Sequence, residues 1–290
     1  MNITNSAKPV NIIQCPVCES SMQPAASGIS CINGHQFDQS KAGYVNLLLT
    51  QHKKTFQPGD SKEMVRARKQ FLNRNRYAPL AELLVQAADR FWPDVDQWAD
   101  IGCGDGWYTR KVKSHLNDTT GFGIDISKFA VQAACKTPHD ISWLVASASR
   151  LPFIDQSLDG AMVVMAKIMP DELIRCMKPG AILLTIGTAK DHLIQLREFL
   201  YPTVKLTDFD GKTALNDSFV EVYSKEVNFE WIPDSLDELT DLLTMTPHHW
   251  RATPERKEQL HQLVNLPMTG HFRLQAWEVQ PTDSDSAKSS

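Results

Sequence analysis

The stretch ADIGCGDGWYT, residues 99–109, decides the expected fold. It places Gly102 at the end of a strand-like segment, residues 95–102, and Gly104 and Gly106 at the start of a helix-like segment, residues 103–116. Such glycines let the backbone turn sharply and approach a ligand closely. Asp125 ends the next strand-like segment, where a carboxylate can accept hydrogen bonds from two ribose hydroxyls. The stretch therefore predicts a nucleoside-containing ligand at the glycine turn.

The chain on both sides of this turn alternates between strand-like and helix-like segments. Strands are expected at residues 121–127, 142–147, 158–165 and 181–188. This alternation predicts an α/β fold with a doubly wound, Rossmann-like parallel sheet, in which ligands bind at the carboxyl ends of the strands. Further strands at 219–231 and 271–279, around helices at 235–245 and 254–264, are expected to form an antiparallel hairpin that ends the sheet.

Four metal-ligating residues lie in two short clusters near the start of the chain, at Cys15, Cys18, Cys31 and His35. Three thiolates and an imidazole at this spacing match a closed, tetrahedral structural Zn²⁺ site. The same ion would fold a segment of about twenty residues that has few core formers. A redox Cys-x-x-Cys, which should follow a strand, and four unrelated residues are the competing interpretations. The other three cysteines are isolated and are expected to be ordinary buried residues: Cys103, Cys135 and Cys176.

The net charge of −4 conceals a strong asymmetry. Residues 1–79 carry ten Lys and Arg against four Asp and Glu, whereas the remainder carries twenty against thirty. A basic front on an acidic body favours an anionic partner such as nucleic acid, although a solvated surface also fits. No run of residues is apolar and long enough for a membrane span, and residues 1–14 lack a signal-peptide pattern. A cytoplasmic protein with no membrane partner is expected.

A basic connector, residues 51–80, joins the two regions. Asp60 is expected to cap a helix, with Glu63 three residues later. The helix is amphipathic, with Met64, Ala67 and Phe71 on its apolar face. The basic residues on its other face and nearby in the chain are Lys53, Lys54, Lys62, Arg66, Lys69, Arg74 and Arg76. They form either a solvated helix face or a surface that contacts phosphates.

These motifs together resemble a known family. The glycine turn with its following acid is similar to that of the S-adenosylmethionine (SAM)-dependent class I methyltransferases. Nearly the whole chain resembles the 23S rRNA (guanine-N1-)-methyltransferases. The matching stretches are CPVC, CINGHQFDQSKAGYVNLL, QHKK, PGDSKEMVRARKQFL, DIGCGDGWYT, DIS, LPF and MTPHHWRA. The resemblance implies one zinc ion on Cys15, Cys18, Cys31 and His35, and SAM contacts from Tyr77, Gly106, Trp107 and His192.

The resemblance also implies the reaction and the partners. The methyl group would go to N1 of a guanine in a stem-loop of 23S rRNA, which a zinc module and the basic helix would hold, and a homodimer is suggested. The corresponding domains are a zinc-binding module at 1–50, the connector at 51–80, a methyltransferase domain at 81–280 and a disordered tail at 281–290. Taken from the residues alone, Tyr77 could instead cap an apolar patch, Trp107 could be core, and His192 could start a helix.

One segment departs from the family pattern. Relatives carry an aromatic residue and a proline of the form Ile-Tyr-Ala-Pro-Cys after the fourth strand, where this chain has VMAKIMP, residues 164–170. The change leaves open a relative that binds RNA and SAM but transfers the methyl group weakly or not at all. A small-molecule methyltransferase is the third alternative. Asp171 and Glu172 could accept a proton or start a helix, and no catalytic residue is assigned.

Overall fold

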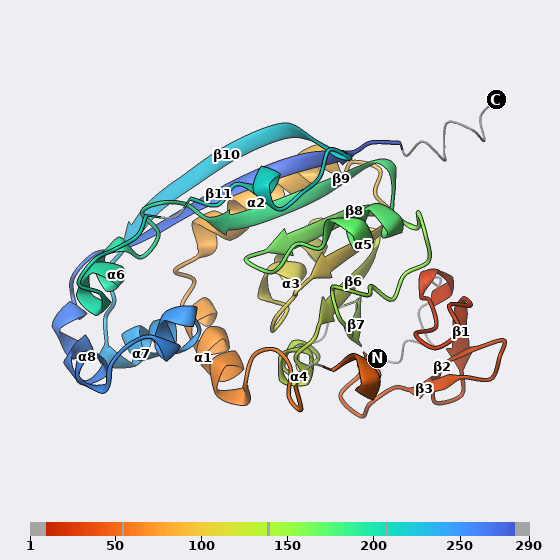
Figure 1. Cartoon of the computed structure of the whole chain (residues 1–290), viewed down its shortest axis with the longest axis horizontal. Helices are drawn as coiled ribbons and strands as arrows, with labels where there is room; N and C mark the ends of the chain where they lie inside the picture. The colour runs from red at the N-terminus through yellow and green to blue at the C-terminus, as the bar shows by residue number, and fades with distance from the viewer. Residues whose placement is uncertain (1–9, 54, 138–139, 207, 282–290) are drawn as a thin grey trace.

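A single large sheet organises the chain. The computed structural model describes residues 10–53, 55–137, 140–206 and 208–281, so Lys54 and the expected tail from residue 282 lie outside it. The sheet has eight strands in the order β10-β11-β9-β8-β5-β6-β7-β4 (Figure 1). The strand β5, Gln97–Ile101, lies between β6 and β8 and leads into the glycine turn. The predicted doubly wound α/β fold is confirmed.

The other strands of the sheet follow the expected segments closely. The parallel strands are β6, Thr120–Asp125; β7, Ile141–Val145; β8, Leu158–Val164; and β9, Met177–Thr188. The long strands β10, Phe219–Trp231, and β11, Met268–Val279, pair antiparallel with each other, and β11 pairs antiparallel with β9. The predicted terminal hairpin is therefore present, with its two helical segments between the strands.

A longer helix precedes β5, and shorter helices connect the later strands. They are α2, Ala78–Phe91; α3, Trp107–Lys113; α4, Lys128–Ala134; α5, Pro170–Cys176; α6, Ile194–Leu200; α7, Leu236–Thr244; and α8, Pro254–Glu258. Single 3₁₀ turns add η4, Gly211–Thr213; η5, Pro247–Trp250; and η6, Gln259–Leu263. Within the described ranges, no helix combines the length and the apolar character that crossing a bilayer requires.

The sheet separates the two larger of three apolar cores, because successive side chains of a strand point to opposite faces. Trp98 of β5 joins the core under α2, whereas Ala99 and Ile101 join the core on the other face. Each large side chain buried in this way stabilises the fold by about 1.5–3 kcal/mol. The second core also contains Ile13 and Met22 from the N-terminal segment.

The N-terminal segment packs onto the sheet and extends it. It contains η2, Val10–Ile12, and a three-stranded sheet of β1, Met22–Ala25; β2, Gly28–Cys31; and β3, Gln36–Asp38. The strand β4, Val45–Asn46, then pairs in parallel with β7, and Gln14 N–H donates to the Pro152 carbonyl at 3.0 Å. The sequence did not predict β4, because two residues are too few to produce a periodic signal.

The connector contains η3, Thr50–His52, and the helix α1, Lys62–Asn73. The expected cap on α1 was wrong by one residue: Ser61 caps the helix, and its hydroxyl accepts from Met64 N–H at 3.2 Å. Asp60 instead forms an ion pair with Arg68, with 2.8 Å between Oδ2 and Nη1. Ala67 and Phe71 of the expected apolar face are buried and the helix packs against α7, whereas Met64 is only partly buried and Val65 is buried in addition.

Candidate functional site

The four predicted metal ligands meet in space. Their ligand atoms, Cys15 Sγ, Cys18 Sγ, Cys31 Sγ and His35 Nδ1, all lie within 4.8 Å of one another. Two turns position them: Cys15 and Cys18 lie on either side of a turn before β1, and Cys31 ends β2 just before the turn that leads to His35. In that second turn Gly34 N–H donates to the Cys31 carbonyl at 3.0 Å.

The distances between these atoms fit a zinc ion. The Cys18 and Cys31 sulfurs are 3.6 Å apart, and His35 Nδ1 lies 3.3–3.6 Å from the three sulfurs. A tetrahedron with Zn–S of about 2.3 Å and Zn–N of about 2.0–2.1 Å has edges of roughly 3.8 Å (S–S) and 3.6 Å (S–N). Three thiolates and one imidazole leave no open position for water, so the geometry matches a structural ion.

The surroundings of the cluster favour thiolate at one of its cysteines. Hydrogen bonds from Ser20 and Asn33 lower the pKa of the Cys18 thiol to about 5, and Ser20 Oγ lies 3.4 Å from the sulfur. Burial acts in the opposite direction on Cys15 and raises the pKa of that thiol. A divalent cation at the centre would stabilise all three thiolates, because metal binding displaces their protons.

A cavity of about 370 Å³ lies where the zinc cluster, the connector and the sheet meet. Cys15 and Pro16 line it on one side and Ser147 and Leu151 on another. Lys53, one of the predicted basic residues, lines it together with Arg150. The Arg150 guanidinium reaches Glu19 Oε1 at 3.0 Å, across the boundary between the N-terminal segment and the large domain.

The glycine turn between β5 and α3 has the backbone that its sequence requires. Gly102, Gly104 and Gly106 have φ of 81°, 57° and 74°, a region that side chains with a Cβ rarely adopt. A Cβ on Gly106 would also lie 2.3 Å from the Trp143 ring. Asp125, at the end of β6, holds the turn in place. Its carboxylate accepts from Gly104 N–H at 2.9 Å and from Ser127 N–H at 2.7 Å.

Two further acids at the turn have unpaired buried oxygens. Asp100 Oδ2 accepts from Thr109 Oγ1 at 2.5 Å, whereas Asp100 Oδ1 and Asp105 Oδ2 are buried without a hydrogen-bond partner. Burial raises the pKa of Asp100 to about 7 and also raises the pKa of Asp105. Such oxygens need a donor or a cation. The ammonium and sulfonium groups of SAM are cationic, so these residues fit that cofactor.

Arg68 of α1 also reaches the glycine turn, and the sequence analysis did not select it. Its guanidinium donates to the Met245 carbonyl at 3.1 Å, in addition to its ion pair with Asp60. A Cβ on Gly104 would lie 3.5 Å from Arg68 Nη1. The connector helix therefore places a cation beside the turn, where it could hold the carboxylate of a zwitterionic ligand. The motif PGDSKEMVRARKQFL contained the signal, but the pattern alone did not show which arginine points inward.

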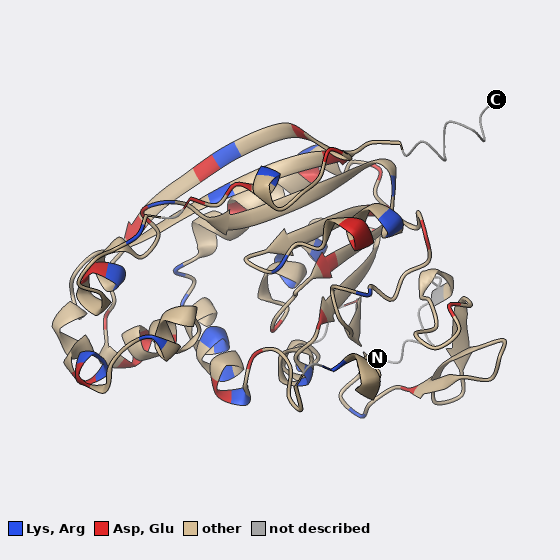
Figure 2. Cartoon of the chain, viewed as in Figure 1, with Lys and Arg blue, Asp and Glu red and all other residues tan. Residues whose placement is uncertain are grey.

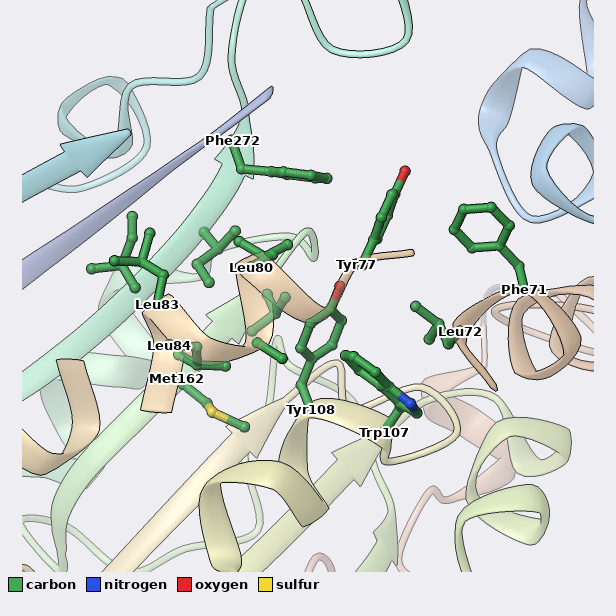
Figure 3. Packing of buried hydrophobic residues seen from close by; sticks show 14 of the residues in the cluster. Phe71, Leu72, Tyr77, Leu80, Leu83, Leu84, Trp107, Tyr108, Met162 and Phe272 are labelled. Atoms are coloured by element: carbon green, nitrogen blue, oxygen red, sulfur yellow. The ribbon is translucent and has the colours of Figure 1, made fainter. Parts of the chain in front are cut away.

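Tyr77 and His192 come together in an aromatic cluster, although they are 115 positions apart in the chain. Their ring centroids are 6.1 Å apart. The Tyr77 ring lies between Phe71 and Phe272, with edge contacts at 5.0 and 5.1 Å (Figure 3). Tyr77 is 2% exposed, and burial raises the pKa of its hydroxyl far above the ordinary value. The apolar-patch interpretation and a SAM contact are compatible here, and the SAM role of both residues stays a prediction.

Trp107 begins α3 at the end of the glycine turn and is 6% exposed. Its ring makes an edge contact with Tyr108, with centroids 4.9 Å apart, and Lys111 Nζ lies 5.4 Å from its centroid. Figure 3 shows Trp107 and Tyr108 at the start of α3, below Tyr77. Trp107 is thus largely core, and its predicted SAM contact would involve its backbone or ring edge.

His192 should make stability depend on pH in a particular window. Burial first, and then His248, Arg197 and His271, lower the pKa of His192 to about 3 from an unfolded value of about 6.5. The unfolded chain therefore binds the extra proton between these values, so stability is complete above pH 6.5 and falls as the pH drops toward 3. The free energy of unfolding, measured with urea across this range, should depend less steeply on pH in His192→Asn than in wild type. The difference in slope should be up to about 1.4 kcal/mol per pH unit.

The matched control for this measurement is His115→Asn, because His115 is exposed. It should retain the wild-type slope. Equal slopes in wild type and His192→Asn would contradict a buried neutral imidazole. The hydrogen bonds agree with the neutral form: His271 N–H donates to His192 Nδ1 at 3.4 Å, which leaves the proton on Nε2.

The predicted basic residues of the connector divide into two groups. Lys62 and Arg66 are exposed, Lys69 is partly buried, and basic residues gather along α1 (Figure 2). Arg74 and Arg76, in contrast, form ion pairs with α7 and the loop before it. Arg76 Nε lies 2.9 Å from the buried Glu238, and Arg74 Nη1 lies 3.7 Å from Asp234. Acids of this region therefore partly neutralise both arginines, and their contact with phosphates stays a prediction.

The divergent segment 164–170 packs against the glycine turn. Ala166 occupies the space that a side chain on Gly102 would need, with 2.4 Å to an ideal Cβ. Met165 has φ of 51° and is 42% exposed, and its N–H donates to the Ile186 carbonyl at 2.8 Å. Glu172 is engaged elsewhere, because its Oε2 accepts from Leu151 N–H at 2.6 Å and from Arg175. Glu172 is therefore a structural acid.

Two family models match the chain in agreement with these two sites. A zinc-ribbon family described as "RlmA, N-terminal" matches residues 13–55, and a family described as "Methyltransferase domain" matches residues 99–180. A solved structure from Bacillus halodurans, described provisionally as a methyltransferase, is also similar. The match covers 64% of this chain and 93% of that chain, at 10% sequence identity and with a TM-score of 0.40. The fold and its site define a class I SAM-dependent methyltransferase with a structural zinc site.

Two curated relatives extend over most of the chain. The 23S rRNA (guanine(748)-N(1))-methyltransferase of Streptomyces fradiae is 32% identical over 266 residues, which cover 89% of this chain and 92% of that protein. The Bacillus subtilis protein YxjB is named provisionally as a 23S rRNA (guanine-N1-)-methyltransferase. It is 31% identical over 283 residues, which cover 89% of this chain and 94% of that protein. The chain belongs to the 23S rRNA (guanine-N1-)-methyltransferase family.

Proposed function

We propose that the protein transfers the methyl group of SAM to N1 of a guanine in a stem-loop of 23S rRNA. The observation that carries the proposal is the position of α1. Its inner face places Arg68 beside the glycine turn, and its outer face exposes Lys62 and Arg66. One helix thus connects a cofactor site with a basic surface, which suits an enzyme that modifies a polyanion.

The chemistry sets requirements for the site. SAM supplies an electrophilic methyl group bound to a sulfonium sulfur. When the methyl group is transferred, the rest of the cofactor is left as a neutral thioether. N1 of neutral guanine carries a proton, and its lone pair becomes available only when that proton departs. Asp100 and Asp105 would hold the cationic end of the cofactor and Asp125 its ribose, while the aromatic cluster around Tyr77 would exclude water. Of the two acids Asp171 and Glu172, Glu172 is held by structural hydrogen bonds. Asp171 is exposed in the first turn of α5 and is the one that could accept the proton.

The target base must also be accessible, because N1 is paired inside a duplex. We infer that residues 1–50 and the connector 51–80 hold the stem-loop by its shape and phosphates, while residues 81–280 take the base. The cavity lined by Lys53 and Arg150 lies at the junction of these regions and would contact the backbone of the RNA. A homodimer and a cytoplasmic location, where rRNA is assembled, belong to the same proposal.

Methyl transfer from labelled SAM to unmodified 23S rRNA, mapped by primer extension, tests the function directly. Methylation at N1 blocks Watson–Crick pairing, so reverse transcriptase should stop at one position. Label without a stop would indicate another target atom. SAM binding without any label would favour a relative that binds but does not transfer, which would point to segment 164–170. Activity on small molecules that survives deletion of residues 1–50 would favour a small-molecule methyltransferase.

The basic face of α1 gives a second test. The double variant Lys62→Glu/Arg66→Glu should raise the Kd for 23S rRNA at least about tenfold near 0.1 M salt and lower the salt dependence of binding, because two phosphate contacts become repulsive. SAM affinity should not change. Filter binding at several salt concentrations measures the effect.

The matched control is Lys212→Glu/Lys225→Glu, which makes the same charge change at exposed residues of η4 and β10. It should bind RNA nearly as well as wild type. Equal losses in both double variants would show that net charge, and not the α1 face, determines RNA affinity.

A further inference from the structure

The most exposed tryptophan of the chain lies at the end of η5. Trp250 is 71% exposed, whereas the other six tryptophans are each at most 8% exposed. A large aromatic side chain contributes most when it is buried, so one held in solvent indicates a surface that meets a partner. Trp250 belongs to the stretch MTPHHWRA, and the site described above gives its indole no role.

The backbone beneath Trp250 is firmly held. His248 Nδ1 lies 2.8 Å from the Tyr201 hydroxyl, and both Arg251 N–H and Ala252 N–H donate to the His248 carbonyl at 3.0 Å. The His249 ring meets the indole edge to face, with centroids 5.0 Å apart and an interplanar angle of 89°. The indole therefore stands on a fixed turn, with its orientation supported by one neighbouring ring. A preorganised ring loses little conformational entropy when a partner binds.

The position of this turn links the two sites of the methyltransferase. Arg68 of α1 donates to the carbonyl of Met245, two residues before η5, so the turn adjoins the helix that exposes Lys62 and Arg66. On its other side, the His248 ring lies against the Tyr201 ring, with centroids 5.7 Å apart. The turn that carries Trp250 thus packs on α7, which in turn packs on the connector helix α1.

An exposed arginine adjoins the indole in the chain. Arg251 is exposed immediately after Trp250, and α8 then carries two basic residues, Arg256 and Lys257, and two acidic ones at its positions 255 and 258. An exposed aromatic ring beside positive charge is the combination with which proteins bind unpaired nucleotides, the ring stacking on a base and the cations meeting phosphates. An apolar protein partner would not require these charges.

We propose that Trp250 stacks on an unpaired base of the substrate RNA and so holds the loop that contains the methylated guanine at the mouth of the site. This inference rests on the proposed rRNA methyltransferase function and adds a specific RNA contact to it. Because every base has a stacking face, the contact contributes affinity and positioning without reading sequence. Arg251 would meet an adjoining phosphate.

The test compares Trp250→Ala with Trp250→Phe in the full-length, zinc-loaded protein, with an unmodified 23S rRNA transcript as probe. Trp250→Ala should raise the Kd for the transcript about 5- to 100-fold, while Trp250→Phe should stay within a few-fold of wild type. SAM affinity and Tm should be unchanged in both variants. In wild type, iodide should quench part of the tryptophan fluorescence, and bound transcript should reduce that quenching. Trp250→Ala should lack this quenchable part of the fluorescence.

Three outcomes would overturn the inference while leaving the enzyme's function intact. Wild-type affinity of Trp250→Ala for the transcript would show that no base stacks there. A common loss of Tm in both variants would show a packing role. Self-association that Trp250→Ala abolishes without a change in RNA affinity would show that the ring meets a second copy of the chain. If the wild type itself failed to methylate the transcript, that result would count against the proposed function. It is distinguished from the stacking inference because methyl transfer and RNA affinity are measured separately.

Discussion

Replacing Cys18 with serine is expected to remove the zinc ion and to destabilise the N-terminal segment. The variant loses one of four ligands from a closed site, and structural zinc sites contribute about 10–16 kcal/mol of binding free energy to folding. Metal analysis should fall from one zinc per chain to nearly none. The Tm should fall clearly, because Ile13 and Met22 share a core with the sheet. SAM binding should largely persist below the transition, since Asp125 and the glycine turn are untouched.

The matched control for this variant is Cys135→Ser, which changes a partly buried, isolated cysteine. It should retain one zinc per chain and most of its stability. Treating wild type with a chelator should reproduce the Cys18→Ser phenotype. Full zinc occupancy in Cys18→Ser would contradict the ligand set.

Replacing Asp125 with alanine is expected to weaken SAM binding by about 100-fold or more. The variant loses an acceptor for two ribose hydroxyls, and hydrogen bonds to a charged acceptor contribute about 1.5–3 kcal/mol each. It also frees Gly104 N–H and Ser127 N–H, so the glycine turn loses its support from β6. Calorimetric titration with SAM measures the effect, and circular dichroism should show that the variant remains folded.

Two further variants sharpen this result. Asp125→Asn keeps an oxygen acceptor but no charge and should fall between wild type and alanine. Asp94→Ala removes an exposed acid from the segment before β5 and should leave SAM affinity unchanged. An unchanged affinity in Asp125→Ala would mean that the ribose binds elsewhere.

The sequence predicted those features that depend on local pattern. Buried strands such as β8 and β9 appeared as apolar runs, and the glycine turn was evident because its backbone admits few other residues. The zinc ligands followed from their spacing, since one tight turn brings each pair to the same ion. These signals arise within short windows, where propensity and covalent geometry decide the outcome.

The features that the sequence missed depend on partners far along the chain. Arg68 contacts the Met245 carbonyl 177 positions later, in addition to Asp60. Arg76 looked like a free cation until Glu238, 162 positions later, was found beside it. Only the folded structure shows that Tyr77 packs within a cluster of rings and that Arg68 points inward. Ion-pair choice and side-chain direction are tertiary properties, and a linear pattern cannot specify them.

The pairing of β4 with β7 has a consequence for synthesis of the chain. Val45 pairs with Leu144, so roughly a hundred residues must emerge from the ribosome before that contact can form. The four zinc ligands, in contrast, all lie between residues 15 and 35 and are available much earlier. Metal loading is therefore expected to precede completion of the sheet, and the metallated segment would then dock as a preformed unit when β7 emerges. The supply of zinc during translation would thus set how much of the enzyme reaches its native state.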